Sequence, residues 1–159
     1  MIPHPLRRAP VLLSSPPVAA SETTVEDCRL LNLPKVVDAR GNLTYIEGGN
    51  HLPFRIRRVY WIYDVPGGEV RGGHAYRELD ELVICLSGSF DFVVDDGSRR
   101  KVVTLNRAFQ GLYVPHLIWR RAENFSTNSA CFILASRPYD PADYLRDYET
   151  YRSLKKIPS

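Results

Sequence analysis

The sequence has no long apolar run and no marked excess of charge of either sign. Its 159 residues nowhere approach the roughly 20 consecutive apolar residues that a membrane-spanning helix needs. The formal net charge is only +3, from 21 basic and 18 acidic residues. That balance gives no support to nucleic-acid binding, although several arginines in one cleft could still hold an anionic ligand. We therefore expect a protein that neither enters a membrane nor binds nucleic acid.

Cysteines are few, and Cys28, Cys85 and Cys131 lack the spacing of a metal site. The last two lie inside the apolar runs VICL and ACFIL, so we expect reduced core residues. The N-terminal stretch has two arginines and a short apolar patch, as a secretory signal does, but prolines interrupt the patch. We therefore predict a flexible tail over residues 1–25 and a cytoplasmic protein.

From residue 26 onward, short segments with strand-like composition follow one another, separated by turns. These segments are 43–47, 56–63, 82–86, 89–95, 101–105, 111–114, 118–122 and 130–135. The length suits one domain with a proper core, here residues 26–159. Together the segments predict an all-β fold, a closed antiparallel barrel or jelly roll whose mouth binds a ligand.

Only the C-terminal segment, about residues 141–155, has a helical pattern. Asp140 can cap a helix, and Pro141 suits the first turn. Tyr144, Leu145 and Tyr148 recur at helical spacing, as does Tyr151 one turn later. We expect one short helix after the strands.

The most informative stretch reads GGHAYRELDELVICLSG, from Gly72 to Gly88. His74 and Tyr76 are two residues apart, so on a strand they point to the same face. An imidazole beside a phenol can move protons on a small molecule. The alternative is that both residues simply fill a half-buried strand.

The spacing of this stretch resembles the first cupin motif, and Gly111, Pro115 and Asn124 echo the second. In metal-binding cupins, two histidines and a glutamate from the first motif and one histidine from the second hold the ion. This sequence has Tyr76 and Arg120 at two of those four positions. Because arginine cannot lose its proton to become a ligand, we expect no metal and no other cofactor.

The sequence more closely resembles the metal-free cupins that act as TDP-4-keto-6-deoxyglucose 3,4-ketoisomerases, the WxcM-like group. The resemblance covers about residues 34–152, and the motifs that carry it are VVDARGNLTYIE, PFRIRRVYWIYDV, RGGHAYRELDELVICLSGSF, GLYVPHLIW and LASRPYDPADYLRDYETY. It implies a cupin jelly-roll barrel that forms a homodimer. It also implies an isomerase that moves the keto group of a TDP-linked deoxysugar from C4 to C3 through an enediol, in the biosynthesis of O-antigen, glycan or antibiotic sugars. The best-known members carry His-Ala-His where this sequence has His74-Ala75-Tyr76.

The intrinsic acidities of the pair suggest the roles of its two side chains. Histidine has a pKa of about 6.5 and tyrosine of about 10. Ionising a tyrosine at neutral pH would therefore need help of roughly 4 kcal/mol from its surroundings. We predict that His74 is the base and that Tyr76 donates a proton or stabilises the enolate.

The remaining candidates would bind the substrate. Arg71 and Arg120 are the first choices for the diphosphate or sugar oxygens, because guanidinium groups suit phosphate, and Arg40 matches a family arginine. Tyr60 and Trp61 point to opposite faces of their strand, and one of those faces could stack on the thymine. Glu81 could orient Tyr76 or an arginine, or be a paired buried carboxylate.

Two other functions stay open at this stage. One is a sugar-nucleotide epimerase of related type, which also removes a proton beside a ketone. The other is a binding protein that keeps the TDP-sugar pocket without turnover. The sequence also leaves open whether the product has the galacto or the gluco configuration at C4.

Overall fold

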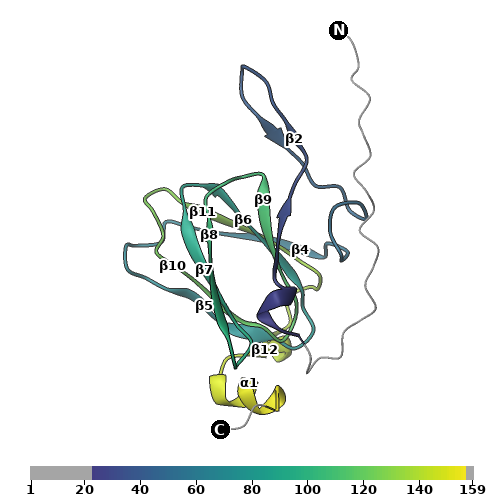
Figure 1. Cartoon of the computed structure of the whole chain (residues 1–159), viewed down its shortest axis with the longest axis vertical. Coiled ribbons are helices and arrows are strands. Elements are labelled where there is room, and N and C mark those ends of the chain that lie inside the picture. The colour runs from purple at the N-terminus through teal and green to yellow at the C-terminus, as the bar shows by residue number, and fades with distance from the viewer. Residues whose placement is uncertain (1–22, 157–159) are drawn as a thin grey trace.

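The computed structural model describes residues 23–156, which form two five-stranded sheets that pack against each other (Figure 1). The first sheet contains, in order, β1 (Arg29–Asn32), β9 (Gln110–Val114), β6 (Glu81–Ser87), β11 (Ala130–Ala135) and β4 (Arg58–Tyr63). The second contains β12 (Tyr144–Leu145), β5 (Arg71–Tyr76), β10 (Trp119–Glu123), β7 (Phe90–Asp95) and β8 (Arg100–Leu105). With a short helix at the C-terminal end, α1 (Tyr148–Leu154), this confirms the predicted all-β cupin jelly roll.

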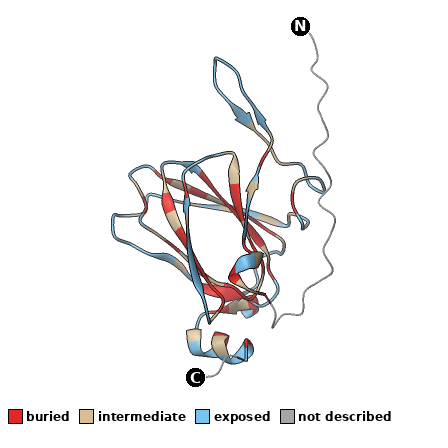
Figure 2. Ribbon diagram, in the orientation of Figure 1, coloured by how far each residue is buried: buried red, intermediate tan, exposed pale blue. Residues whose placement is uncertain are grey.

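The core lies between the inward faces of the two sheets (Figure 2). Val83 and Cys85 from β6 meet Phe92 and Val94 from β7, and all four are almost fully buried. Leu82 and Ile84, which alternate with them along β6, point outward. They too are buried, because the segment 46–56 covers them. Burial on both faces explains why β6 reads as a continuous apolar run rather than as an alternating strand.

A small hairpin of β2 (Lys35–Val36) and β3 (Leu43–Thr44) projects from the body at the end opposite α1 (Figure 1). The strand predicted over 43–47 is therefore shorter than expected. Val37, next to β2, is 73% exposed, and Leu43 in β3 is 56% exposed.

The predicted helix over 141–155 is wrong in its first half. Asp140 does accept a hydrogen bond from the amide of Ala142, but it caps only a single 3-10 turn, η2 (Pro141–Asp143). The chain then extends and pairs with β5 as β12, and α1 begins only after Asp147, whose carboxylate accepts from the amide of Thr150. Antiparallel pairing with the sheet outweighs the helical spacing of the apolar residues in this segment.

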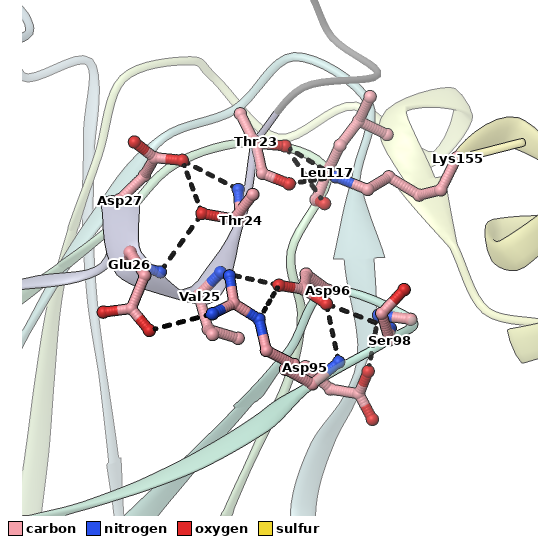
Figure 3. A network of polar contacts seen from close by, with 12 residues as sticks. Thr23, Thr24, Val25, Glu26, Asp27, Asp95, Asp96, Ser98, Leu117 and Lys155 are labelled. Carbon is pink, nitrogen blue, oxygen red and sulfur yellow. Dashed lines mark hydrogen bonds and ion pairs between the residues drawn. The ribbon is translucent and has the colours of Figure 1, made fainter. Parts of the chain in front are cut away.

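The tail predicted over residues 1–25 lies largely outside the described residues, but Thr23, Thr24 and Val25 belong to the folded body (Figure 3). Lys155, just beyond α1, donates to the carbonyl of Thr23 and, at 3.0 Å, to its hydroxyl. The amide of Val25 donates to the carboxylate of Asp96 at 3.0 Å. A short 3-10 turn, η1 (Val25–Asp27), follows. The C-terminal helix thus fastens the N-terminal segment to the sheets.

All three cysteines are buried as free thiols, as expected of core residues. In the part of the chain that the structure describes, no helix has both the length and the apolar character to span a membrane.

Candidate active site

Strand β5 brings His74 and Tyr76 to the same inward face, as the alternation predicts. Their rings meet edge to face, with centroids 4.8 Å apart. Gly72, the second residue of the strand, has a φ of +77° and lies so close to Arg120 that a Cβ atom would come within 2.5 Å of Nη1. Glycine is therefore required for Arg120 to reach the site.

A buried ion pair joins the two sheets behind these rings. Arg120 in β10 contacts Glu81 in β6 through Nε to Oε1 at 2.8 Å and donates from Nη2 to Oε2 at 2.9 Å. The two side chains are 4% and 1% exposed. The same guanidinium donates to the carbonyl of Gly72 at 2.9 Å and to the hydroxyls of Tyr60 at 3.3 Å and Tyr76 at 3.2 Å. Since both terminal nitrogens of this buried guanidinium donate to protein atoms, Arg120 is placed to hold the phenols rather than to bind a diphosphate.

Tyr144, from β12, completes the ring cluster. Its ring centroid lies 4.9 Å from that of His74 and 4.8 Å from that of Tyr76. Two cations flank it: the guanidinium of Arg146 lies 4.3 Å from the centre of its ring, and Arg58 interacts with its side chain electrostatically. Arg58 also lies over the ring of Tyr60, at 4.9 Å.

A cavity of about 230 Å³ lies between the sheets. Its lining includes Tyr60, His74, Tyr76, Arg120 and Tyr144. A second cavity of about 460 Å³ adjoins it, lined by residues from 61 to 71. Arg71, Trp61 and Ile62 line both. Arg71 is exposed and makes no ion pair within residues 23–156, so its guanidinium is free for an anion at the junction of the two cavities.

The surroundings hold His74 in its neutral form. Burial lowers the pKa of His74 to about 2, with the positive charges of Arg120 and Arg146 adding to the effect. Its buried Nε2 has no hydrogen-bond partner among residues 23–156. Burial, together with the nearby negative charge of Glu81, raises the pKa of Tyr76 well above its usual range. The site therefore offers an unprotonated imidazole beside protonated phenols at neutral pH.

Tyr60, Trp61 and Arg40, the other predicted binding residues, take three different places. Tyr60 faces the interior and donates to Glu81 at 3.3 Å, whereas Trp61 points outward, is 60% exposed and stacks on Phe132 with ring centroids 6.3 Å apart. Arg40 lies in the loop of the β2–β3 hairpin, paired with Asp38 at 2.8 Å, and lines neither of the two adjoining cavities. The structure thus brings together every predicted site residue except Arg40.

The residues at the four cupin ligand positions do not suit a metal ion. Glu81, which would be a ligand, is bound to the guanidinium of Arg120, and that positive charge would repel a divalent cation. In the described range 23–156, no group of three or more His, Cys, Asp or Glu side chains is arranged to hold one.

Sequence reasoning missed Tyr144, Arg58 and Arg146. Tyr144 was assigned to the helix, although Asp147, three residues before Thr150, was an available signal that the helix starts later. Both arginines lie in stretches that carry the family resemblance, but nothing in those stretches marks them as residues of the site, and only the pairing of β12 with β5 brings Arg146 next to the cavity.

Comparison with known proteins agrees with this geometry. The sequence profile of the family described as "FdtA: WxcM-like, C-terminal" matches residues 26–156. The TDP-4-oxo-6-deoxy-alpha-D-glucose-3,4-oxoisomerase of Aneurinibacillus thermoaerophilus is 39% identical over 124 residues, covering 78% of this chain and 89% of that protein.

Two crystal structures of the 3,4-ketoisomerase QdtA from Thermoanaerobacterium thermosaccharolyticum also resemble the chain. The complex with TDP has a TM-score of 0.81 at 34% identity, covering 84% of this chain and 97% of that one. A mutant in complex with TDP-4-keto-6-deoxyglucose has a TM-score of 0.80 at 35% identity, covering 81% and 94%. Because the profile spans nearly the whole described chain and the relatives exceed 30% identity, this chain belongs to the FdtA (WxcM-like, C-terminal) family and is an isomerase.

Proposed function

We propose that this protein moves the keto group of TDP-4-keto-6-deoxyglucose from C4 to C3. The reaction removes the proton from C3, passes through an enediol and returns a proton to C4. It needs a base that is unprotonated at neutral pH and a donor for the enolate oxygen. The observation that carries the proposal is the neutral His74, whose Nε2 has no partner among the described residues 23–156, beside phenols in a cavity flanked by arginines.

The two cavities divide the substrate between them. The 230 Å³ cavity takes the keto sugar, because the imidazole and the phenols line it. The 460 Å³ cavity takes the nucleoside, with Trp61 at the shared rim as an aromatic surface for the base. Arg71, at the junction, binds the diphosphate, since guanidinium groups form paired hydrogen bonds with phosphate oxygens.

Incubation with TDP-4-keto-6-deoxyglucose in deuterated water tests this function. An isomerase moves the keto group to C3 and places label at C4. An epimerase leaves the keto group at C4, inverts C3 or C5 and labels the inverted carbon. A binding protein does neither. Recovery of unchanged substrate, or of an epimer, would contradict the proposal, and the configuration of the product at C4 would decide between galacto and gluco.

We further propose that the protein works as a homodimer in the cytoplasm and without a metal ion. The exposed apolar side chains of the β2–β3 hairpin support the dimer, and the free buried thiols support a reducing compartment. The pairing of Glu81 with Arg120 supports the absence of a metal. A role of Arg40 in substrate binding stays a proposal and requires a second copy, because Arg40 lines neither cavity of its own chain.

A further inference from the structure

Tyr76 is the phenol nearest to His74 in the sequence, but other side chains engage its hydroxyl group. Tyr76 is 4% exposed, and its oxygen accepts a hydrogen bond from Nη2 of Arg120 at 3.2 Å. The same oxygen lies 3.5 Å from the hydroxyl of Tyr60, and it donates to the hydroxyl of Tyr144 at 3.5 Å. The Tyr76 proton is therefore directed toward another side chain and not toward the cavity.

Tyr144 is more exposed than Tyr76. Its oxygen accepts a hydrogen bond from Tyr76 at 3.5 Å, and the guanidinium of Arg58 is close enough to interact with it electrostatically. Its own hydroxyl proton has no acceptor among residues 23–156. Tyr144 is only partly buried and lines the cavity beside His74, with ring centroids 4.9 Å apart. Its proton is therefore the one available to a ligand there, and Arg58 is placed to stabilise the phenolate that remains after its loss.

We infer that Tyr144 is a catalytic residue that carries the hydroxyl proton of the sugar from O3 to O4, an inference that rests on the proposed ketoisomerase function. His74 takes the proton from C3, the electron pair forms the C3–C4 double bond, and the C4 carbonyl oxygen receives the proton of Tyr144. The O3 proton then passes to the Tyr144 phenolate, the C3 carbonyl forms, and C4 takes the proton from His74. Both side chains return to their starting states, and no further reactant is needed. Tyr76, Arg120 and Glu81 then act as positioning residues behind Tyr144.

The test compares two rates in deuterated water: product formation, and incorporation of deuterium at C3 of recovered substrate. Tyr144→Phe keeps the ring that packs on His74 and removes only the hydroxyl. We expect product formation to fall about 10²- to 10⁴-fold, the usual effect of losing a positioned acid or base. Deuterium incorporation at C3 should fall by less, because His74 can still remove that proton. The ratio of exchange to isomerisation therefore rises in Tyr144→Phe, whereas His74→Asn should abolish both.

Tyr139→Phe is the matched control, because Tyr139 packs edge-on against Tyr144 at 5.9 Å but is 60% exposed. It should leave both rates within about twofold of the wild type. If Tyr144→Phe turns over like the wild type, or if both rates fall in parallel, Tyr144 is not the carrier of the hydroxyl proton. A wild type that does not isomerise TDP-4-keto-6-deoxyglucose would instead overturn the underlying function.

Should Tyr144→Phe not fold, a fluorinated tyrosine at position 144 gives a second measurement. Fluorine lowers the pKa of the phenol while keeping its shape and its proton. The alkaline limb of kcat should then move to lower pH, and an unmoved limb would contradict the assignment.

Discussion

His74 is a weak base in the free protein, yet it is the base best placed to reach a sugar carbon. Burial and two guanidinium groups keep it uncharged, and its Nε2 has no partner in the part of the chain that the structure describes. A diphosphate bound by Arg71 would bring negative charge to the cavity that His74 lines and so oppose part of this lowering of its pKa. Binding of the anionic substrate would then raise the basicity of His74 when it is needed.

His74→Asn should lower kcat by about 10²- to 10⁴-fold, because the base is lost while the side chain keeps a similar size and polarity. The affinity for TDP, measured by calorimetry, should stay within about twofold of the wild-type value, since the substitution leaves Arg71 and the 460 Å³ cavity unchanged. His51→Asn is the control, because His51 bonds to the amide of Glu47 outside both cavities. Turnover of His74→Asn at the wild-type rate would show that the base lies elsewhere.

The same histidine should make the fold sensitive to acid. The pKa of His74 is about 2 in the folded protein, against about 6.5 for an unperturbed histidine. Between these values the unfolded chain binds a proton that the folded chain does not, so stability falls as the pH falls below 6.5. One such proton changes the free energy of unfolding by about 1.4 kcal/mol per pH unit.

Urea unfolding of wild type and His74→Asn at pH 6.5, 5.5 and 4.5 measures this effect. The difference between the two proteins isolates His74, because His116, whose pKa is raised mainly by its hydrogen bond to Asp80, is present in both. We expect the wild type to lose more stability over this range than the variant. Parallel curves would mean that His74 is not held neutral by the fold.

The contacts between elements explain which predictions from the sequence succeeded. The strands that alternate, such as β4, were identified because one side of each faces the core and the other faces water. The pairing of His74 with Tyr76 followed from the same period. Tyr144 was missed because its position depends on pairing between β12 and β5, which are 68 residues apart at Tyr144 and Tyr76. The spacing of residues within one segment does not predict its pairing with a strand so distant in the sequence.

The position of Arg120 also differs from the one expected from the sequence. Arg120 was expected at the substrate, but the structure shows it bound to Glu81 and Gly72. The sequence does not show whether a guanidinium group is free or already paired, because its partner, here Glu81, lies on another strand. Arg71 and Arg120 look alike in the sequence and differ only in their burial and their contacts.

The ion pair between Glu81 and Arg120 joins β6 to β10 and hence one sheet to the other. Glu81→Gln leaves a buried guanidinium without its counter-charge, so we expect the free energy of unfolding to fall by about 3–5 kcal/mol. Glu26→Gln breaks an exposed pair with Arg99, 3.5 Å long, and should cost less than about 1 kcal/mol. Equal effects of the two changes in urea unfolding would contradict a role for the buried pair in joining the sheets.

At the scale of the whole molecule, the exposed apolar side chains of the β2–β3 hairpin suggest that the chain does not act alone. The β2–β3 hairpin projects from the body (Figure 1) and exposes Val36, Val37 and Leu43, although two paired strands of two residues each are marginal on their own. Near its base, an apolar groove of about 640 Å³ runs over the outer face of the first sheet, lined by Leu33, Ile84 and other side chains. A projecting apolar hairpin and an apolar groove on one chain are the parts from which a self-complementary interface is built.

Sedimentation equilibrium at micromolar concentration should therefore give twice the chain mass of 18.1 kDa. Val37→Asp should shift the mass toward that of one chain, because it would place an unpaired carboxylate in an apolar interface. Val102→Asp is the matched control: Val102 in β8 is also an exposed valine, at 55% against 73% for Val37, but it lies on the other sheet, away from the hairpin. A monomeric wild type, or equal dissociation by both changes, would contradict an interface at the hairpin. If Val37→Asp is monomeric and also loses turnover while still binding TDP, the second copy contributes to the active site, as a substrate-binding role for Arg40 requires.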